Sequence, residues 1–282
     1  MSGTLYVVGT PIGNLSDLSP RAVEILQAVD FIAAEDTRVT LKILNHFGIK
    51  KPQVSYYEHN LREKGEQIVR RIQGGESCAI VTDAGMPCIS DPGEDLVRLC
   101  AGEGIPVSPV PGPSAAITAL AVSGLPTARF AFEGFLSMNR KRRMERLEQI
   151  QKDDRTLIFY EAPHKLRETL KDLLEGLGDR RISLCRELTK VHEEVRRTTL
   201  KEAVLYYNQE ENKPKGEFVL VVEGMSQEER ESAEAMTLEE AVQLAKRLRD
   251  EGTPPSEAAK QAAKISRQKK NDIYRAMSAE AL

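Results

Sequence analysis

The amino-acid sequence predicts an α/β protein with two α/β domains and a small C-terminal helical module. Short apolar runs alternate with amphipathic segments over residues 1–116, which favours a mostly parallel, doubly wound sheet. Strand-like runs recur over residues 117–225 at spacings too short for parallel crossovers throughout, so we expect a mixed sheet there. Residues 226–236 are polar and acidic, which is typical of a linker, and residues 237–282 predict a helix-turn-helix-like unit.

In the first domain, apolar runs and capping signals define the elements in order. The predicted strands cover residues 5–8, 31–34, 54–57, 77–81 and 105–110. The predicted helices cover residues 19–28, 40–47, 62–73, 94–101 and 115–123. Open α/β sheets bind ligands beyond the carboxyl ends of their strands. The turns that follow these strands are therefore where we expect a ligand site.

The same signals continue through the second domain and the helical module. The predicted strands cover residues 132–136, 156–160, 182–185 and 218–222. The predicted helices between them cover residues 140–151, 165–177 and 201–207. Three further amphipathic helices are predicted at residues 238–249, 256–265 and 271–277.

The stretch TDAGMPCISDPG, residues 82–93, is the most informative loop of the chain. Gly85 and Gly93 can adopt backbone conformations closed to other residues, and Pro87 and Pro92 keep helix and strand out of the loop. Twelve residues exceed what a simple strand-to-helix connection needs. We interpret the loop as a ligand-binding element, with a tight turn that binds nothing as the alternative.

The turn GTPIGN, residues 9–14, follows the first strand but is neither a G-x-G-x-x-G motif nor a P-loop. Pro11 also removes a backbone N–H that could bind a phosphate, so a nucleoside ligand without phosphates is favoured. Glu35 and Asp36 stand where a dinucleotide fold binds a ribose, although Asp36 would also serve as the N-cap of a helix. His59 either contacts substrate or is simply solvated.

Composition sets limits on partners and compartment. The 282 residues carry a net charge of −3 and no Trp, so the chain as a whole does not attract nucleic acid and offers no obvious aromatic platform for bases. Four Cys form no C-x-x-C pair and the four His are widely spread, so we expect no metal site and a reducing, cytoplasmic environment. No signal sequence or membrane-spanning stretch is expected.

Two local clusters of basic residues could supply the attraction to RNA that the net charge does not. Arg140, Lys141, Arg142 and Arg143 begin a predicted helix, where cations oppose the helix dipole, so an anion-binding role is favoured over a solvated turn. Residues 246–275 hold nine Lys and Arg against four acids, a net of +5, and include Lys269 and Lys270. A dimerisation tail is the alternative for this second cluster.

Taken together, the motifs resemble one family over nearly the whole chain. They are GTPIGN, AAEDTR, TDAGMPCISDPG, VPGPSAAITAL, FEGFL, TLIFYEAPHKL, RELTK, KGEFVLVVEG and KKNDIY. Their order resembles the ribosomal RNA small subunit methyltransferase I family, within the tetrapyrrole methylase superfamily of class III methyltransferases. Two positions depart from the pattern: Met86 replaces the acid of the superfamily's G-D-P turn, and Leu61 stands where family members often carry an acid.

The resemblance implies S-adenosylmethionine as methyl donor, bound in a cleft between the two α/β domains. It also implies transfer to the ribose 2′-hydroxyl of a cytidine in the decoding region of 16S ribosomal RNA, within the small subunit, by a homodimer. By position, the donor site would include Thr10, Pro11, Met86, Ile89, Ser114, Ala115, Tyr160, Leu188, Gly216 and Glu217.

The sequence leaves the general base and some rival functions open. Glu187 and Lys190 of RELTK are the first candidates because they follow a strand that should end at the cleft, while Glu35 and Asp36 are others. Glu187 could instead form an ion pair with Arg186 or another cation. Alternative functions are a tetrapyrrole methyltransferase, which would not need the basic helices, and a non-catalytic ribosome-binding factor. A nicotinamide dehydrogenase is disfavoured by the incomplete glycine motif.

Overall fold

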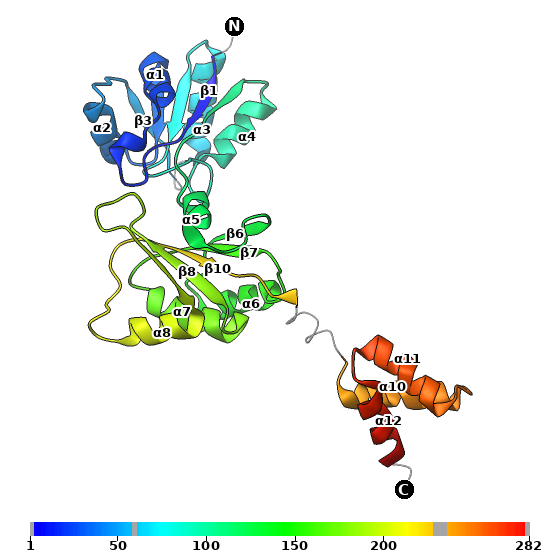
Figure 1. The fold of residues 1–282 in the computed structure, drawn as a ribbon. Helices are drawn as coiled ribbons and strands as arrows, with labels where there is room; N and C mark the ends of the chain where they lie inside the picture. Colours follow the sequence, from blue (N-terminus) through cyan, green and yellow to red (C-terminus); the bar gives the residue numbers. More distant parts are fainter. Residues whose placement is uncertain (1–2, 58–60, 228–235, 280–282) are drawn as a thin grey trace. The chain divides into compact units, whose positions relative to one another are not determined.

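The chain forms two compact units, each described here by itself. In the computed structural model, the first unit comprises Met1–Gln151 and Arg155–Gly224, and the second comprises Lys152–Asp154 and Met225–Leu282. The described parts of the chain are residues 3–57, 61–227 and 236–279. Over these parts the first unit holds two β-sheets with their helices, and the second holds a helical bundle (Figure 1). The predicted fold class is confirmed.

The first sheet is entirely parallel, with strand order β3-β2-β4-β1-β5. Its strands are β1 (Leu5–Val8), β2 (Phe31–Ala34), β3 (Gln53–Ser55), β4 (Cys78–Val81) and β5 (Val107–Val110). The connections contain η1 (Leu15–Asp17), α1 (Pro20–Ala28), α2 (Thr37–His46), α3 (Leu61–Gln73) and α4 (Glu94–Gly102). Every residue of β2 and β4 is buried because apolar clusters cover both faces of the sheet, which is why these strands are continuous apolar runs.

The second sheet is mixed, as predicted, with strand order β6-β7-β10-β8-β9. β6 and β7 are parallel and the other pairs are antiparallel. Its strands are β6 (Phe130–Phe135), β7 (Thr156–Glu161), β8 (Arg181–Arg186), β9 (Glu194–Thr199) and β10 (Phe218–Val222), and its helices are α5 (Ala115–Ser123), α6 (Arg140–Ile150), α7 (Leu166–Leu177) and α8 (Leu200–Asn208).

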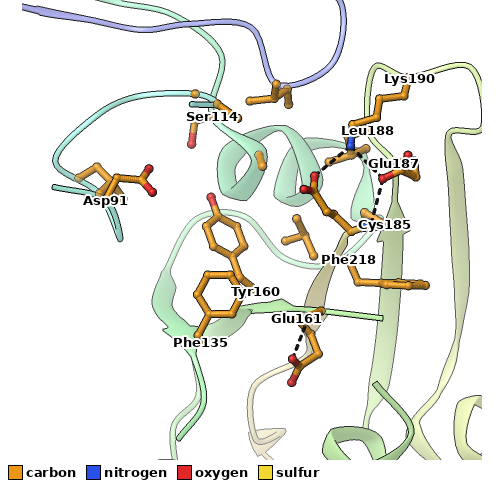
Figure 2. A pocket seen from close by; sticks show the side chains of 18 of the residues that line it. Asp91, Ser114, Phe135, Tyr160, Glu161, Cys185, Glu187, Leu188, Lys190 and Phe218 are labelled. Carbon is orange, nitrogen blue, oxygen red and sulfur yellow. Dashed lines mark hydrogen bonds and ion pairs between the residues drawn. The ribbon is translucent and has the colours of Figure 1, made fainter. Parts of the chain in front are cut away.

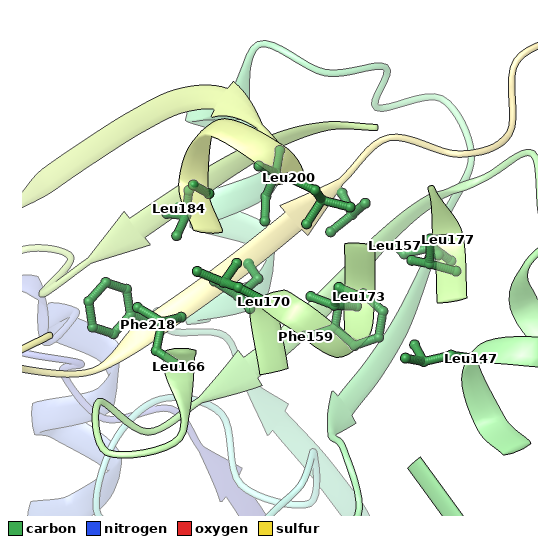
Figure 3. Close-up of a cluster of buried hydrophobic side chains, with 14 of the residues drawn as sticks. Leu147, Leu157, Phe159, Leu166, Leu170, Leu173, Leu177, Leu184, Leu200 and Phe218 are labelled. Atoms are coloured by element: carbon green, nitrogen blue, oxygen red, sulfur yellow. The ribbon is translucent and has the colours of Figure 1, made fainter. Parts of the chain in front are cut away.

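Two apolar clusters cover the faces of this second sheet. On one face, Leu166, Leu170 and Leu173 of α7 pack against strand residues such as Phe159 and Phe218 (Figure 3). On the other face lies α5, whose buried side chains belong to a cluster with residues of β7, β8 and β10. Helix α5 follows directly from the first sheet and packs on the second, so both sheets belong to one compact unit. The domain boundary at residue 116 stays a prediction.

Strand β9 was not expected from the sequence. Its segment, EVRRTT, pairs with β8 along six residues but contains no apolar run. It is an edge strand whose residues are at most half-buried, so charged and hydroxyl side chains suffice. Apolar periodicity, which detected the central strands, therefore gave no signal here.

The second unit is a bundle of α10 (Leu238–Asp250), α11 (Pro255–Ser266) and α12 (Lys270–Ala279). A capping box of Thr237 and Glu240 begins α10, which satisfies N–H groups of its first turn. The core is small and is built largely from alanines, together with Ile273 and Met277. Most of the predicted linker, residues 228–235, lies outside the described residues. Among the helices described in either unit, none has both the length and the apolar character that crossing a lipid bilayer requires.

Candidate functional site

A cavity of about 470 Å³ lies within the first unit and is lined by residues from both sheets. From the first sheet it takes Ile12, Ala84, Gly85, Met86, Ile89, Asp91, Ser114 and Ala115, and from the second Phe135, Tyr160, Glu161, Ala162, Pro163, Cys185, Glu187, Leu188, Lys190, Glu217, Phe218 and Val219. Figure 2 shows these side chains converging from the loops and from the start of α5. The lining is mainly apolar with a few polar groups, which is the usual composition of a small-molecule site.

The loop 82–93 forms one wall of the cavity and is held in an unusual backbone conformation. Cys88 and Ser90 adopt φ values of 70° and 64°, which non-glycine residues rarely do. Thr10 fixes the loop to the turn after β1: its N–H donates to the Gly85 carbonyl at 2.9 Å, and its hydroxyl donates to the Thr82 carbonyl at 3.1 Å. Such strain is characteristic of ligand-binding and catalytic loops, and it supports the ligand-binding interpretation.

The glycine turn after β1 serves chain packing and is not a phosphate cradle. A Cβ on Gly9 would lie only 2.7 Å from the Cα of Gly112 and 2.7 Å from the sulfur of Met86. Two glycines therefore allow the turn after β1 and the turn after β5 to touch, which brings Ser114 and Ala115 to the cavity.

Seven of the ten predicted donor-site residues line the cavity. They are Met86, Ile89, Ser114, Ala115, Tyr160, Leu188 and Glu217. Thr10, Pro11 and Gly216 do not line it. Thr10 is occupied in fixing the loop 82–93, and its neighbour Ile12 reaches the cavity instead. Gly216 has φ 78°, and a Cβ there would lie 2.5–2.7 Å from the Glu187 side chain, so it makes room for that carboxylate.

Tyr160 joins the two halves of the cavity. Its hydroxyl accepts a hydrogen bond from the Ala116 N–H, 3.2 Å away, at the start of α5. Burial raises its pKa, so the phenol stays neutral. Its ring makes edge contacts with Phe132 and with Phe135, the latter at a centroid distance of 5.5 Å. Phe135 nevertheless remains 63% exposed and lines the cavity.

Glu187 and Lys190, the candidate catalytic pair, both line the cavity but are paired with each other (Figure 2). The Glu187 carboxylate accepts hydrogen bonds from the Glu217 N–H and from Lys190 Nζ, each at 2.9 Å. The Glu217 N–H is the main cause of a lowered pKa for Glu187, with Lys190 adding to it. Glu187 is therefore held as a carboxylate with little affinity for a proton. The ion-pair alternative fits its geometry better than a role as base.

Asp91 is the cavity carboxylate that sequence reasoning missed. The motif TDAGMPCISDPG contains it, but its glycines and prolines predict a ligand-binding loop without assigning a role to Asp91. Burial, together with the nearby charge of Glu35, raises the pKa of Asp91 to about 6. Two carboxylates of one cavity, Asp91 and Glu187, therefore have pKa values shifted in opposite directions.

Glu161 is a third carboxylate of the cavity, and its role is structural. It is buried, and it accepts hydrogen bonds from the Thr169 hydroxyl and from the Ala162 N–H. These contacts fix the turn between β7 and α7.

The acids after β2 differ in role. Asp36 caps α2 through the Arg38 N–H at 2.8 Å and forms an ion pair with the Arg38 guanidinium at 2.6 Å, so the N-cap alternative is confirmed. Glu35 accepts a hydrogen bond from the Thr82 hydroxyl at 2.6 Å, next to the cavity. His59 lies outside the described residues.

The cluster Arg140–Arg143 is only partly available to RNA, which corrects the sequence interpretation. Arg143 is 3% exposed, and its guanidinium bonds Asp172 and Glu168 at 2.6 Å each. Arg140 pairs with Asp172 at 3.1 Å and with Glu175 at 2.8 Å. These carboxylates neutralise the cations that the sequence pattern had assigned to an anion. Lys141 and Arg142 remain exposed and stay candidates for RNA binding.

The buried pair of Arg143 and Asp172 gives a test of stability. We expect Asp172→Ala to lower the free energy of unfolding by about 3 kcal/mol, because it leaves a buried guanidinium with one acidic partner fewer. The matched control Glu175→Ala removes an exposed partner of Arg140 and should cost about 1 kcal/mol or less. Urea denaturation followed by circular dichroism measures both. Equal effects of the two substitutions would contradict the assignment of Arg143 to the core.

The described residues offer no cluster of three or more His, Cys, Asp or Glu that could hold a metal ion. The four cysteines are free thiols; Cys78, Cys100 and Cys185 are buried and Cys88 is half-buried.

Comparison with known proteins identifies the fold and the family. The family model described as Tetrapyrrole (Corrin/Porphyrin) Methylases matches residues 4–204. A diphthine synthase covers 79% of this chain and 91% of its own at TM-score 0.60 and 16% identity. A uroporphyrin-III-C-methyltransferase from Thermus thermophilus covers 78% and 94% at TM-score 0.54 and 20% identity. At these identities the two structures show a shared fold.

Relatives of higher identity carry one common name, ribosomal RNA small subunit methyltransferase I. The protein of that name from Synechocystis is 46% identical over 96% of both chains. The one from Escherichia coli O157:H7 is 46% identical over 97% of this chain and 94% of its own. The one from Halalkalibacterium halodurans is 53% identical over 79% of this chain and 76% of its own. This chain therefore belongs to the ribosomal RNA small subunit methyltransferase I family of tetrapyrrole methylases.

Proposed function

We propose that this protein methylates the ribose 2′-hydroxyl of a cytidine in the decoding region of 16S ribosomal RNA, within the small ribosomal subunit. S-adenosylmethionine is the methyl donor, as in methylases of this family. The observation that carries the proposal is the mainly apolar cavity lined from both sheets, in a chain whose relatives over almost its full length are named ribosomal RNA small subunit methyltransferases.

The residues of the cavity fit this donor. A volume of about 470 Å³ lies in the range of small-molecule sites. Ser114 and Ala115 bring the N-terminus of α5 to the cavity, and a helix N-terminus favours a carboxylate such as that of a methionine moiety. Met86, Ile89 and Leu188 offer apolar contacts without phosphate-binding groups. When bound, the donor supplies an electrophilic methyl group on a positively charged sulfur.

The protein's part in the reaction is alignment, exclusion of water and handling of one proton. Apolar side chains of both sheets enclose the site, so a ribose hydroxyl would be held with few competing waters. Phe135, exposed yet in contact with the Tyr160 ring, gives an unpaired base a surface on which to stack. Recognition of a splayed, single-stranded nucleotide is the common mode of sequence-specific RNA binding.

We also propose that the helical second unit binds the RNA outside the cavity. Its segment 246–275 has a net charge of +5 within a chain of net charge −3. Lys269 and Lys270 are both exposed at the start of α12, where a helix favours phosphate contacts. The proposal includes action in the cytoplasm, where a ribosomal substrate is found. It also includes a homodimer, in keeping with the exposed apolar side chains Ile117, Phe130 and Met138.

Mapping of ribose methylation tests the proposal directly. Small-subunit RNA from cells that contain or lack this protein is hydrolysed in alkali, because a 2′-O-methyl group blocks cleavage at its own nucleotide. We expect one protected cytidine in the decoding region only when the protein is present, and its restoration by purified protein with S-adenosylmethionine. Identical cleavage patterns would refute the proposal. Methylation of a tetrapyrrole by the purified protein would favour a tetrapyrrole methyltransferase. Lack of donor binding in calorimetry would favour a non-catalytic ribosome-binding factor.

A further inference from the structure

We propose that Asp91 is the general base of this methyl transfer and accepts the proton of the ribose hydroxyl. The inference rests on the proposed function and adds a catalytic residue to it. A hydroxyl is a weak nucleophile until its proton is removed or shared in the transition state, so a base beside the reacting oxygen is needed.

The cavity presents few groups that could serve. Glu187 is held by the Glu217 N–H and by Lys190, each at 2.9 Å, and Glu161 is held by Thr169 and the Ala162 N–H in fixing a turn. Lys190 is itself held as a cation, because its bonds to Glu187 and Glu217 outweigh its burial and raise its pKa. Glu217, the remaining lining acid, is paired with Lys190 Nζ at 2.9 Å and is otherwise exposed to solvent. Among the carboxylates that line the cavity, the geometry therefore leaves Asp91 for proton transfer.

The position of Asp91 supports the role. It follows the two strained residues Cys88 and Ser90 in loop 82–93, and Figure 2 shows its carboxylate directed into the cavity, toward the side on which Ser114 and Tyr160 lie. It thus faces the segment that we assign to the donor, in a cavity that Phe135 also lines. We therefore place the reacting ribose in this cavity, beside Asp91.

The charges around Asp91 suit a base that works near neutral pH. Glu35, after β2, and Asp83, after β4, are acids whose negative charges raise its pKa, and burial is the largest cause of the rise. The Thr82 hydroxyl donates its one proton to Glu35 at 2.6 Å, and Tyr160 faces the group as a neutral phenol. The result is a pKa of about 6, high enough to bind a proton and low enough to be free of one at pH 7.

The step balances without further reagents. The hydroxyl proton passes to the Asp91 carboxylate while the ribose oxygen forms its bond to the methyl carbon. The electron pair of the broken sulfur–methyl bond remains on sulfur, which loses its positive charge. The proton leaves Asp91 to solvent once the product has gone, because its pKa lies below 7.

The first test compares Asp91→Asn with Glu94→Gln, a nearby exposed carboxylate in the first turn of α4 that does not line the cavity. We expect Asp91→Asn to lower kcat for small-subunit methylation by about 10²–10⁴-fold, with donor affinity by calorimetry unchanged. Asp91→Glu should restore part of the rate, and Glu94→Gln should behave as wild type. Wild-type turnover by Asp91→Asn would overturn the assignment.

The pH profile supplies a readout that a structural role would not move. The base must be unprotonated, so kcat should fall as pH decreases through about 6. Glu35→Gln removes a negative charge that raises this pKa, so the midpoint should move to lower pH. A midpoint that stays at the wild-type pH in Glu35→Gln, or that moves to higher pH, would overturn the inference.

The outcomes separate this inference from the proposed function. A wild-type protein that does not methylate ribosomal RNA under any of these conditions would refute the function and the base together. A wild-type protein that methylates RNA while Asp91→Asn retains its rate and its acid limb would refute the base alone.

Discussion

Ala115→Leu is expected to abolish binding of S-adenosylmethionine while the protein stays folded. Ala115 lies at the first position of α5 and lines the cavity, where its small side chain leaves the helix N-terminus open to a ligand. A leucine adds three carbon atoms at a position that lines the space assigned to the donor. We expect donor affinity in calorimetry to fall about 100-fold or more, equivalent to about 3 kcal/mol.

The same helix offers a matched control. Ala121→Leu makes the same change on an exposed position of α5 that does not line the cavity. It should leave donor affinity unaltered, and both variants should unfold within about 1 kcal/mol of wild type. Full donor affinity in Ala115→Leu would mean that the donor does not occupy this cavity. Loss of affinity in both variants would point to a general effect on α5.

Central strands were the part of the fold most open to prediction from sequence. β1 and β2 begin and end at the predicted residues, because parallel strands that are covered on both faces require continuous apolar runs, and these runs end at a glycine and at a charged residue. β9 escaped prediction because an edge strand needs no such run. The burial and ion pairing of Arg143 could not be predicted either. Its partner Asp172 is 29 positions away in the chain and meets it only through the packing of α6 and α7.

The candidate site was predictable to the extent that it depends on topology. Strand ends of one sheet meet at one edge, so Met86 and Ser114 could be placed together from the strand pattern alone. Whether Thr10 or Ile12 lines the cavity depends on the direction in which each side chain points after a turn. The sequence shows no periodicity from which that direction could be predicted. The distinction between Glu187 and Asp91 depends on hydrogen bonds and burial, which arise only once both sheets are packed.

Removal of the second unit should separate donor binding from RNA methylation. Residues 1–224 contain both sheets, their cores and every residue that lines the cavity, so a chain without residues 225–282 should bind S-adenosylmethionine with unchanged affinity. It should lose the segment of net charge +5, and kcat/KM for small ribosomal subunits should fall on the order of 100-fold. Calorimetry with the donor and transfer of labelled methyl to purified subunits measure the two quantities.

A pair of substitutions in the full chain tells RNA contact from a stabilising role of the same unit. Lys269 and Lys270 are exposed at the start of α12, so changing both to Ala should spare the bundle's core. Each lost phosphate contact should reduce the slope of log affinity against log salt by about 0.7–0.9, giving a flatter salt dependence and weaker RNA binding. Lys141→Ala with Arg142→Ala makes the corresponding change at the start of α6, where the neighbouring Arg140 and Arg143 are already paired with acids. If the slope of log affinity against log salt changes only in this second variant, the RNA-binding residues lie on α6. The helical unit would then be a dimerisation or stability element.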